Sequence, residues 1–239
     1  MENHPVLYSY RRCPYAMRAR IGIYLSGIPV EQREIVFWDK PEPMLQASPK
    51  GTVPVLILSD GQVIDESRDI LIWAFNQAEQ ACSDLIPQDS ELMLQMNQWI
   101  DRNDDEFKIW LDQYKYSDRF PENSQTYYRQ QGEVFLSAIE QALQAHPYLL
   151  GEHLTVADLA IFPFIRQFVN VDKPWFEQAD YPNLKSWLAC HLQSDYFLNV
   201  MKNRPVWQAG HVPLWVHEVA LKTKNEFTDK ALKRIECID

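Results

Sequence analysis

The stretch VLYSYRRCPYAMRARIGIYLSG, residues 6–27, decides the fold. Its apolar and aromatic start predicts a short strand over residues 6–10. Pro14 then stands where proline favours the first position of a helix, and Gly27 stands where such a helix takes its C-terminal cap. Cys13 therefore lies between the end of a strand and the first turn of a helix.

The rest of the first eighty residues continues to alternate strand and helix signals. A second strand is predicted over residues 30–36, and two more over residues 53–59 and 62–65 flank an Asp-Gly pair, a strong hairpin signal. Ser67 then opens a helix with apolar residues on one face. The first two strands should be parallel, because a helix joins them, and the last two antiparallel.

After a linker near residues 78–89, strand-like alternation gives way to helical spacing. One helix start is marked by LTVADLAIF, in which Thr155 and Asp158 occupy the two positions of a capping box. Pro163 falls inside the same helix, where it removes a backbone hydrogen bond.

We therefore predict an α/β domain over residues 1–80 and an all-α domain over residues 88–239. From about residue 206 the all-α domain carries an additional helical tail, with Val216 and Phe227 among its apolar residues. The tail either shields the mouth of a site or contacts a partner, and the sequence does not decide between these roles.

Composition excludes several classes of protein. The chain has 239 residues, 46% of them hydrophobic, and a net charge of −10, which argues against nucleic-acid binding. No apolar run reaches the roughly 20 residues of a membrane span. The start also lacks the basic residues followed by an apolar run that mark a secretory signal.

The four scattered cysteines are predicted to be reduced thiols in the cytoplasm. His217 begins an HExxH-like pattern, but Leu221 replaces its second histidine, so no metal site is predicted.

Cys13 is the strongest candidate for chemistry. A sulfur at a helix N-terminus faces unsatisfied backbone N–H groups and the positive end of the helix dipole, which stabilise a thiolate. Four nearby arginines, Arg11, Arg12, Arg18 and Arg20, add positive charge. The plain alternative is a buried cysteine that packs as a small hydrophobe. For the other three cysteines, this packing role or simple exposure is the preferred interpretation.

Four motifs in order resemble the cytosolic glutathione transferase superfamily over about residues 5–200: CPYAMRAR, KGTVPVL, DES and LTVADLAIF. CPYA preceded by arginine is similar to the cysteine-type members, the omega-like and glutaredoxin-like classes. The resemblance implies a thioredoxin-like α/β N-terminal domain and an all-α C-terminal domain. It also implies that the first domain holds glutathione and that the chain forms a homodimer.

The resemblance further implies specific site residues. The peptide bond before Pro54 should be cis, with the backbone of Val53 pairing with the cysteinyl part of glutathione, although composition alone favours a trans proline. Glu66 and Ser67 should bind the γ-glutamyl end of glutathione, and Lys40 should bind the glycine end of glutathione. The plain alternatives are a helix cap at Ser67 and a solvated loop lysine at Lys40.

Ala16 stands where a redox protein carries a second cysteine, so Cys13 has no resolving thiol beside it. We expect a thiol transferase or reductase with glutathione as co-substrate and an acceptor of the small electrophilic or disulfide type. One alternative is a conjugating transferase in which a hydroxyl of Tyr8, Ser9 or Tyr10 activates glutathione. Another is a non-enzymatic binding or regulatory protein of the same fold.

Overall fold

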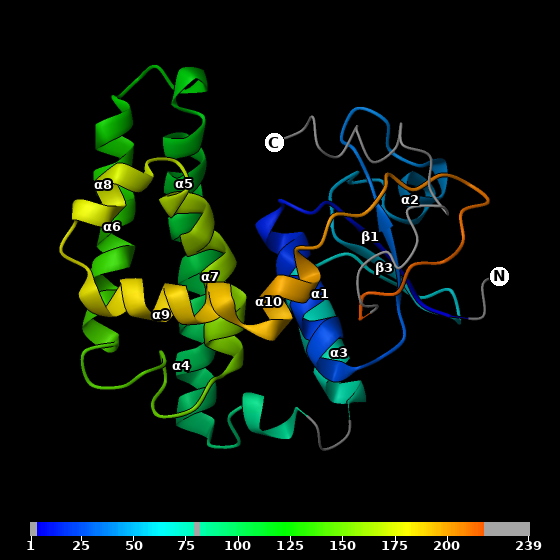
Figure 1. Cartoon of the computed structure of the whole chain (residues 1–239), viewed down its shortest axis with the longest axis horizontal. Coiled ribbons are helices and arrows are strands. Elements are labelled where there is room, and N and C mark those ends of the chain that lie inside the picture. Colours follow the sequence, from blue (N-terminus) through cyan, green and yellow to red (C-terminus); the bar gives the residue numbers. More distant parts are fainter. Residues whose placement is uncertain (1–3, 79–81, 218–239) are drawn as a thin grey trace. The chain divides into compact units, whose positions relative to one another are not determined.

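A four-stranded sheet forms the centre of the N-terminal half of the computed structural model, which describes residues 4–78 and 82–217. Its order is β2-β1-β3-β4. Strand β1 pairs parallel with β2, while β1–β3 and β3–β4 are antiparallel, as predicted (Figure 1). The strands are β1 (Val6–Ser9), β2 (Glu31–Glu34), β3 (Val55–Ile57) and β4 (Val63–Ile64).

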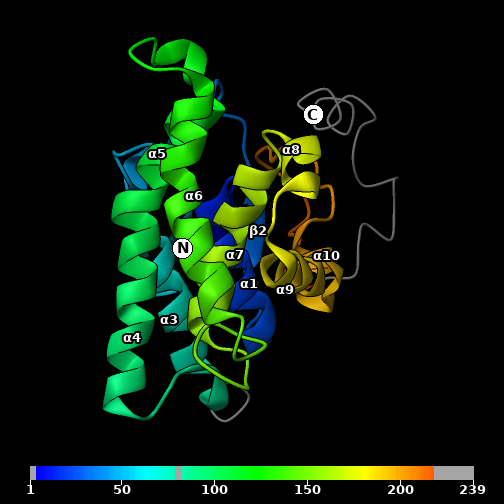
Figure 2. The ribbon, with the colours of Figure 1, turned by 90° about the vertical axis from the view of Figure 1, so that its left-hand side faces the viewer.

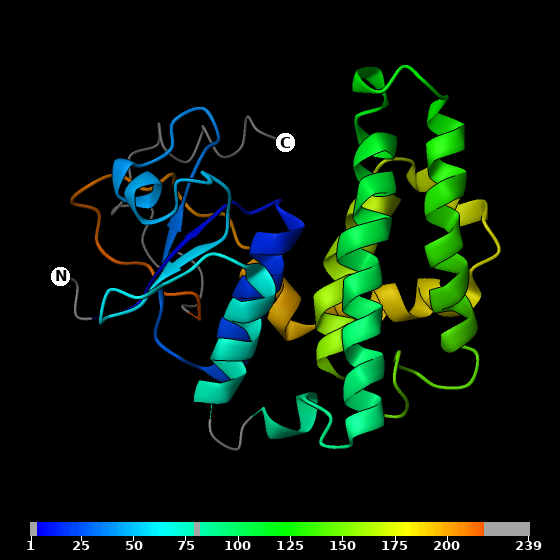
Figure 3. The same ribbon diagram turned by 180° about the vertical axis from the view of Figure 1, so that it is seen from behind.

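Two helices cover one face of this sheet and a third covers the other. Leu7 and Leu56 pack with residues of α1 and α3, which lie side by side (Figure 3), whereas Tyr8 and Val55 pack with Met44 of α2. The alternation follows from the period of two in a strand. Gly27 ends α1 with a φ of 71°, the left-handed cap predicted there. The helices are α1 (Pro14–Ser26), α2 (Glu42–Ala47) and α3 (Ser67–Gln77).

The segment Ser83–Gln193 forms a second unit made of helices. Helix α4 continues through a π-helical turn into α5, so that the three form one column (Figure 2). The elements are η1 (Ser83–Leu85), α4 (Ser90–Asp101), η2 (Arg102–Phe107), α5 (Lys108–Lys115), η3 (Ser117–Arg119), α6 (Gln125–Ala142), α7 (Val156–Val169), α8 (Lys173–Gln178) and α9 (Pro182–Gln193). The α/β plus all-α architecture predicted from the sequence is confirmed.

The predicted capping box opens α7, the most buried helix of this unit. The Thr155 N–H and hydroxyl both donate to Oδ2 of Asp158, each at 3.0 Å. Oδ1 accepts from the Leu149 N–H and from Nε1 of Trp187, each at 2.9 Å. Four hydrogen bonds therefore satisfy a carboxylate that is fully buried, which joins the start of α7 to the preceding loop and to α9.

Strand β2 is unusual because its sequence is EQRE and all four side chains are buried. Its outer edge is covered by the C-terminal segment, residues 204–216. The N–H of Gln32 donates to the Leu214 carbonyl at 2.6 Å, and the Trp207 N–H donates to the Glu34 carbonyl at 2.8 Å. The segment thus forms one isolated bridge at each end of β2, antiparallel at Glu31 and parallel at Glu34, and protects the edge of the sheet.

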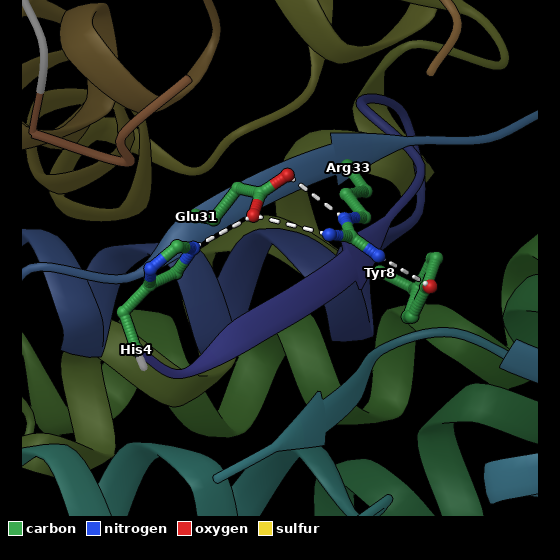
Figure 4. Close-up of polar contacts among 4 residues, drawn as sticks. All are labelled: His4, Tyr8, Glu31 and Arg33. Carbon is green, nitrogen blue, oxygen red and sulfur yellow. Dashed lines mark hydrogen bonds and ion pairs between the residues drawn. The ribbon is translucent and has the colours of Figure 1, made fainter. Parts of the chain in front are cut away.

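One face of β2 carries a network around the guanidinium of Arg33 (Figure 4). Nε and Nη2 of Arg33 donate to the two carboxylate oxygens of Glu31 at 2.8 and 3.2 Å, and Nη1 donates to the Tyr8 hydroxyl at 2.9 Å. His4 contacts Glu31 at 2.9 Å, and the ring of Trp207 lies 4.4 Å from the guanidinium carbon. Burial opposes ionisation of Glu31, but hydrogen bonds from Arg33 and His4 lower its pKa.

Residues 194–217, which include α10 (Asp195–Val200), group with the first unit, whereas the all-α domain predicted from the sequence spans residues 88–239. Helix α10 packs against α1, and the segment that follows it pairs with β2. The helical tail predicted from about residue 206 is wrong for residues 206–217, which contain bridges and turns but no helix, and the rest of the predicted tail lies outside the described residues. None of the helices in residues 4–78 and 82–217 has the length and apolar character that a membrane crossing requires.

His191 of α9 should make the stability of the second unit depend on pH. The ring is 1% exposed and stacks on Phe162 at 4.8 Å, and burial lowers the pKa of His191 to about 3. In the unfolded chain the His191 ring takes up a proton near pH 6.5, whereas in the native state it does not until the pH approaches 3. The contribution of this ring to the free energy of unfolding is therefore full above pH 6.5 and decreases as the pH falls toward 3. We expect a loss of about 2 kcal/mol between pH 8 and pH 5.

The variant His191→Phe keeps an aromatic ring at this position and removes the titrating group. Urea unfolding of both proteins, followed by circular dichroism at pH 8 and pH 5, measures the effect. The wild type should lose about 2 kcal/mol of unfolding free energy relative to the variant. An equal difference at the two pH values would contradict the assignment.

Arg33→Met should destabilise the protein by about 3–5 kcal/mol, because it leaves the Glu31 carboxylate buried without its main partner. The double variant Glu31→Gln/Arg33→Met removes the uncompensated charge and should be more stable than Arg33→Met alone. Urea unfolding of the three proteins at pH 7.5 gives the comparison. If the double variant is the less stable of the two, the network does not balance charge in this way.

Candidate active site

Cys13 is the N-cap residue of α1, with φ −72° and ψ 123°, and Pro14 follows at the first helical position. Its carbonyl accepts from the Met17 N–H at 2.8 Å, and its own N–H donates to the Tyr10 carbonyl at 3.1 Å. The half-buried thiol lies 3.7 Å from the carbonyl oxygen of Val53. The sulfur therefore occupies the strand-to-helix junction that the sequence predicts.

The Val53–Pro54 peptide bond is cis, as predicted. Both residues are buried, and the contact with Cys13 joins the loop before β3 to the loop before α1. Lys40 lies beside the same loop. Its Nζ atom would be 3.4 Å from a Cβ atom placed on Gly51. Lys40 is half-buried, and its Nζ lies 5.9 Å from the centre of the Phe37 ring.

Ser67 and Glu66 lie at the start of α3 and differ in exposure. Ser67 is the first residue of α3 and is buried at 4% exposure, and its hydroxyl accepts from Nη1 of Arg18 at 3.3 Å. Glu66 is the N-cap residue, and its side chain is 66% exposed. Arg18 therefore connects the helix that carries the thiol to the start of α3.

Lys50, for which the sequence predicts no role, is a neighbour of Glu66. Its Nζ contacts Glu66 Oε1 at 2.6 Å and Asp65 Oδ1 at 3.1 Å. The hydrogen bonds that Lys50 donates to Glu66 and Asp65 raise the pKa of Lys50. A hydrogen bond donated by the Ser48 hydroxyl, together with the one from Lys50, lowers the pKa of Asp65. Lys50 belongs to the KGTVPVL motif, but spacing alone does not indicate which carboxylates a long side chain reaches. Exposed pairs of this kind are weak, so a ligand cation competes with Lys50 at little cost.

The three hydroxyls weighed as alternatives to the thiol are all engaged with arginines. Tyr8 is fully buried, and its hydroxyl accepts from Arg33. Ser9 is also fully buried, and its hydroxyl accepts from Arg20. The hydroxyl of Tyr10 accepts from Nε and Nη2 of Arg12 at 3.2 and 3.1 Å.

The four arginines expected around Cys13 divide into two kinds. Arg18 and Arg20 are fully buried, directed to Ser67 and to the end of β1 respectively, while Arg11 and Arg12 remain partly exposed. The arrangement combines a sulfur at a helix start, a nearby backbone carbonyl and a polar helix start at α3. Within the described residues, no group of three or more potential metal-ligating side chains comes together.

Two family models match the chain. The glutathione S-transferase N-terminal domain matches residues 7–81, and the glutathione S-transferase C-terminal domain matches residues 97–190. Together the two matches include Cys13, the Val53–Pro54 bond and the start of α3.

Curated relatives of several kinds are similar to the chain. A probable glutathione S-transferase parA of Nicotiana tabacum is 25% identical over 85% of this chain and 90% of its own length. Elongation factor 1-gamma of Drosophila melanogaster is 26% identical over 82% of this chain, which spans only 46% of that protein. Glutathione S-transferase omega-1 of Sus scrofa is 43% identical, but over 61 residues, 26% of this chain and 25% of its own length.

Solved structures share the fold. A glutathione S-transferase from Methylobacillus flagellatus, with glutathione bound, superposes with a TM-score of 0.70 at 25% identity, covering 82% of this chain and 98% of the other. Glutathione transferase Omega 3C from Trametes versicolor gives a TM-score of 0.72 at 18% identity, covering 85% and 91%. With both domain models matched in order on this architecture, the chain belongs to the glutathione S-transferase superfamily.

Proposed function

We propose that the chain is a cysteine-type, omega-like member of this superfamily that acts as a glutathione-dependent thiol transferase. The observation that carries the proposal is the position of Cys13 at the start of α1, 3.7 Å from the Val53 carbonyl, with the buried Ala16 where a second thiol would stand. The helix start stabilises the thiolate. Tyr8 and Ser9 are fully buried, which supports the thiol over a mechanism in which one of their hydroxyls contacts glutathione.

Glutathione would bind across the three loops that meet at this end of the sheet. The backbone of Val53 pairs with its cysteinyl part, and Lys40 binds the carboxylate at its glycine end. Ser67 accepts a hydrogen bond from Arg18, so its own hydroxyl hydrogen is available for the ligand's α-carboxylate. Glu66 pairs with the ligand's ammonium group in competition with Lys50.

The reaction needs two thiol–disulfide exchanges. The Cys13 thiolate attacks the glutathionyl sulfur of a mixed disulfide, the S–S bond breaks, and the acceptor leaves as a thiolate that takes a proton. The thiolate of a second glutathione attacks the same glutathionyl sulfur, which releases oxidised glutathione and restores the Cys13 thiolate. Two glutathione molecules thus supply the two electrons that reduce the acceptor.

A non-enzymatic role is the second candidate, favoured by the similarity to elongation factor 1-gamma over 82% of this chain. A binding protein of that kind would have no need for a reactive thiol.

A conjugating transferase is the third candidate, in which glutathione's own thiolate attacks an electrophile. We further propose that the enzyme is a cytoplasmic homodimer that uses small acceptors of the electrophilic or disulfide type.

The Cys13 thiol should form a single mixed disulfide with glutathione. Intact-mass measurement after incubation with oxidised glutathione should show one glutathionyl group, mapped to Cys13 by peptide analysis. Cys13→Ala should lose the adduct and reduce thiol transferase activity on the order of a thousandfold or more, because the nucleophile is gone.

Cys190→Ser is the matched control, since it removes an exposed cysteine of the other unit. This variant should keep both the adduct and the activity. A wild-type protein that forms no adduct, or an active Cys13→Ala variant, would contradict the thiol mechanism. Conjugating activity that appears in Cys13→Ser would show that glutathione is bound in the proposed orientation.

Ser67→Ala should weaken glutathione binding by about 10- to 100-fold, the effect of losing a hydrogen bond to a charged group. Glu66→Gln is the matched exposed substitution and should weaken it by less than about fivefold, because exposed pairs contribute little. Isothermal titration calorimetry on Cys13→Ala protein measures both without covalent turnover. Equal affinity in the Ser67→Ala variant would remove Ser67 from the site.

A further inference from the structure

We infer that Arg20 is the residue that positions Cys13 and supplies the buried positive charge beside its thiolate. The inference rests on the proposed role of Cys13 as the nucleophile. Arg20 lies on α1, two turns after Cys13, and its side chain is fully buried. No motif identifies it, because CPYAMRAR contains two arginines with the same appearance.

Arg20 holds the segment that leads from β1 to Cys13. Nη1 donates to the Tyr10 carbonyl at 3.2 Å and to the Ser9 hydroxyl, while Nη2 donates to the Arg11 carbonyl at 2.7 Å. Three successive residues before the nucleophile are therefore fixed by one guanidinium. A planar fork of five N–H donors is suited to this task, and a lysine ammonium is not.

The link to Cys13 passes through one shared acceptor. The Tyr10 carbonyl accepts from Arg20 and also from the Cys13 N–H at 3.1 Å. A shift of that carbonyl would move the backbone of Cys13, and with it the sulfur relative to the Val53 carbonyl. Displacements of about 1 Å at a nucleophile lower rates by about a hundredfold.

The same guanidinium is anchored at its other side to the end of α10. Nε donates to the Val200 carbonyl at 3.1 Å, and Nη2 lies 4.0 Å from the Met201 sulfur. These contacts prevent the side chain from rotating away from the Cys13 loop.

The charge of Arg20 is maintained at neutral pH. Burial lowers the pKa of Arg20 to about 10, and the nearby charges of Arg204 and Arg11 lower it further. Glu34 on β2 and Cys13 act in the opposite direction and raise it. Burial raises the pKa of Glu34, whose carboxylate accepts from the Arg11 N–H and from Gln32. Arg20 thus remains a cation, and because it shares the Tyr10 carbonyl with the Cys13 N–H, its charge lies near Cys13 in surroundings that screen the interaction little.

Alkylation of Cys13 by iodoacetamide, followed by peptide mass spectrometry as a function of pH, tests the charge without glutathione. In the full-length Arg20→Met protein the pH midpoint should rise by about one unit, and the rate at pH 7 should fall about tenfold. The double variant Glu31→Gln/Arg33→Met is the matched control, because it removes another buried arginine of the same unit together with the carboxylate that this arginine balances, and it should leave the midpoint unchanged. An unshifted midpoint in Arg20→Met would overturn the role of the charge.

Arg20→Lys separates position from charge and serves if Arg20→Met does not fold. It should keep the midpoint within a few tenths of a pH unit, yet slow adduct formation with oxidised glutathione about tenfold, because a lysine cannot make the three loop contacts. A wild-type rate in Arg20→Lys would overturn the positioning role. If wild-type Cys13 forms no adduct at all, the proposed function fails, while the alkylation profile still decides on Arg20.

Discussion

The junction between β1 and α1 depends on a single carbonyl oxygen, that of Tyr10. It terminates the central strand and accepts hydrogen bonds from the Cys13 N–H and from the buried Arg20. Because the carbonyl is fixed from both sides, the thiol stays at the helix start and beside Val53. The loops before α1, β3 and α3 then converge on one end of the sheet, which is where small ligands bind in many α/β proteins.

Local signals in the sequence were sufficient to predict the elements whose ends are marked by proline, glycine or capping residues. Pro14 and Gly27 set the bounds of α1, the Asp-Gly pair set the hairpin of β3 and β4, and Thr155 with Asp158 set the start of α7. Each of these signals acts within a few residues of the chain. The cis bond before Pro54 came from the resemblance, since composition favoured trans.

What the sequence did not reveal depends on partners distant in the chain. A strand reading EQRE has no apolar alternation, and its burial requires the C-terminal segment on its outer edge. The same pairing contributes to the boundary between the units, because Val206 and Trp215 form bridges to β2. The direction of the Tyr8 and Ser9 hydroxyls, toward Arg33 and Arg20, likewise depends on tertiary packing. The complete burial of both residues disfavours the hydroxyl mechanism more than any motif does.

The pairing of β2 with the C-terminal segment also has a consequence for synthesis on the ribosome. Strand β2 is made early, yet the backbone groups that satisfy its outer edge belong to residues near Trp207 and Leu214. The whole helical unit is translated between them. Until residue 214 leaves the exit tunnel, the nascent chain exposes an unpaired strand edge and buried charges without all their partners, the features that engage chaperones. Folding of the domain that carries Cys13 is therefore completed only after the whole helical unit has been translated.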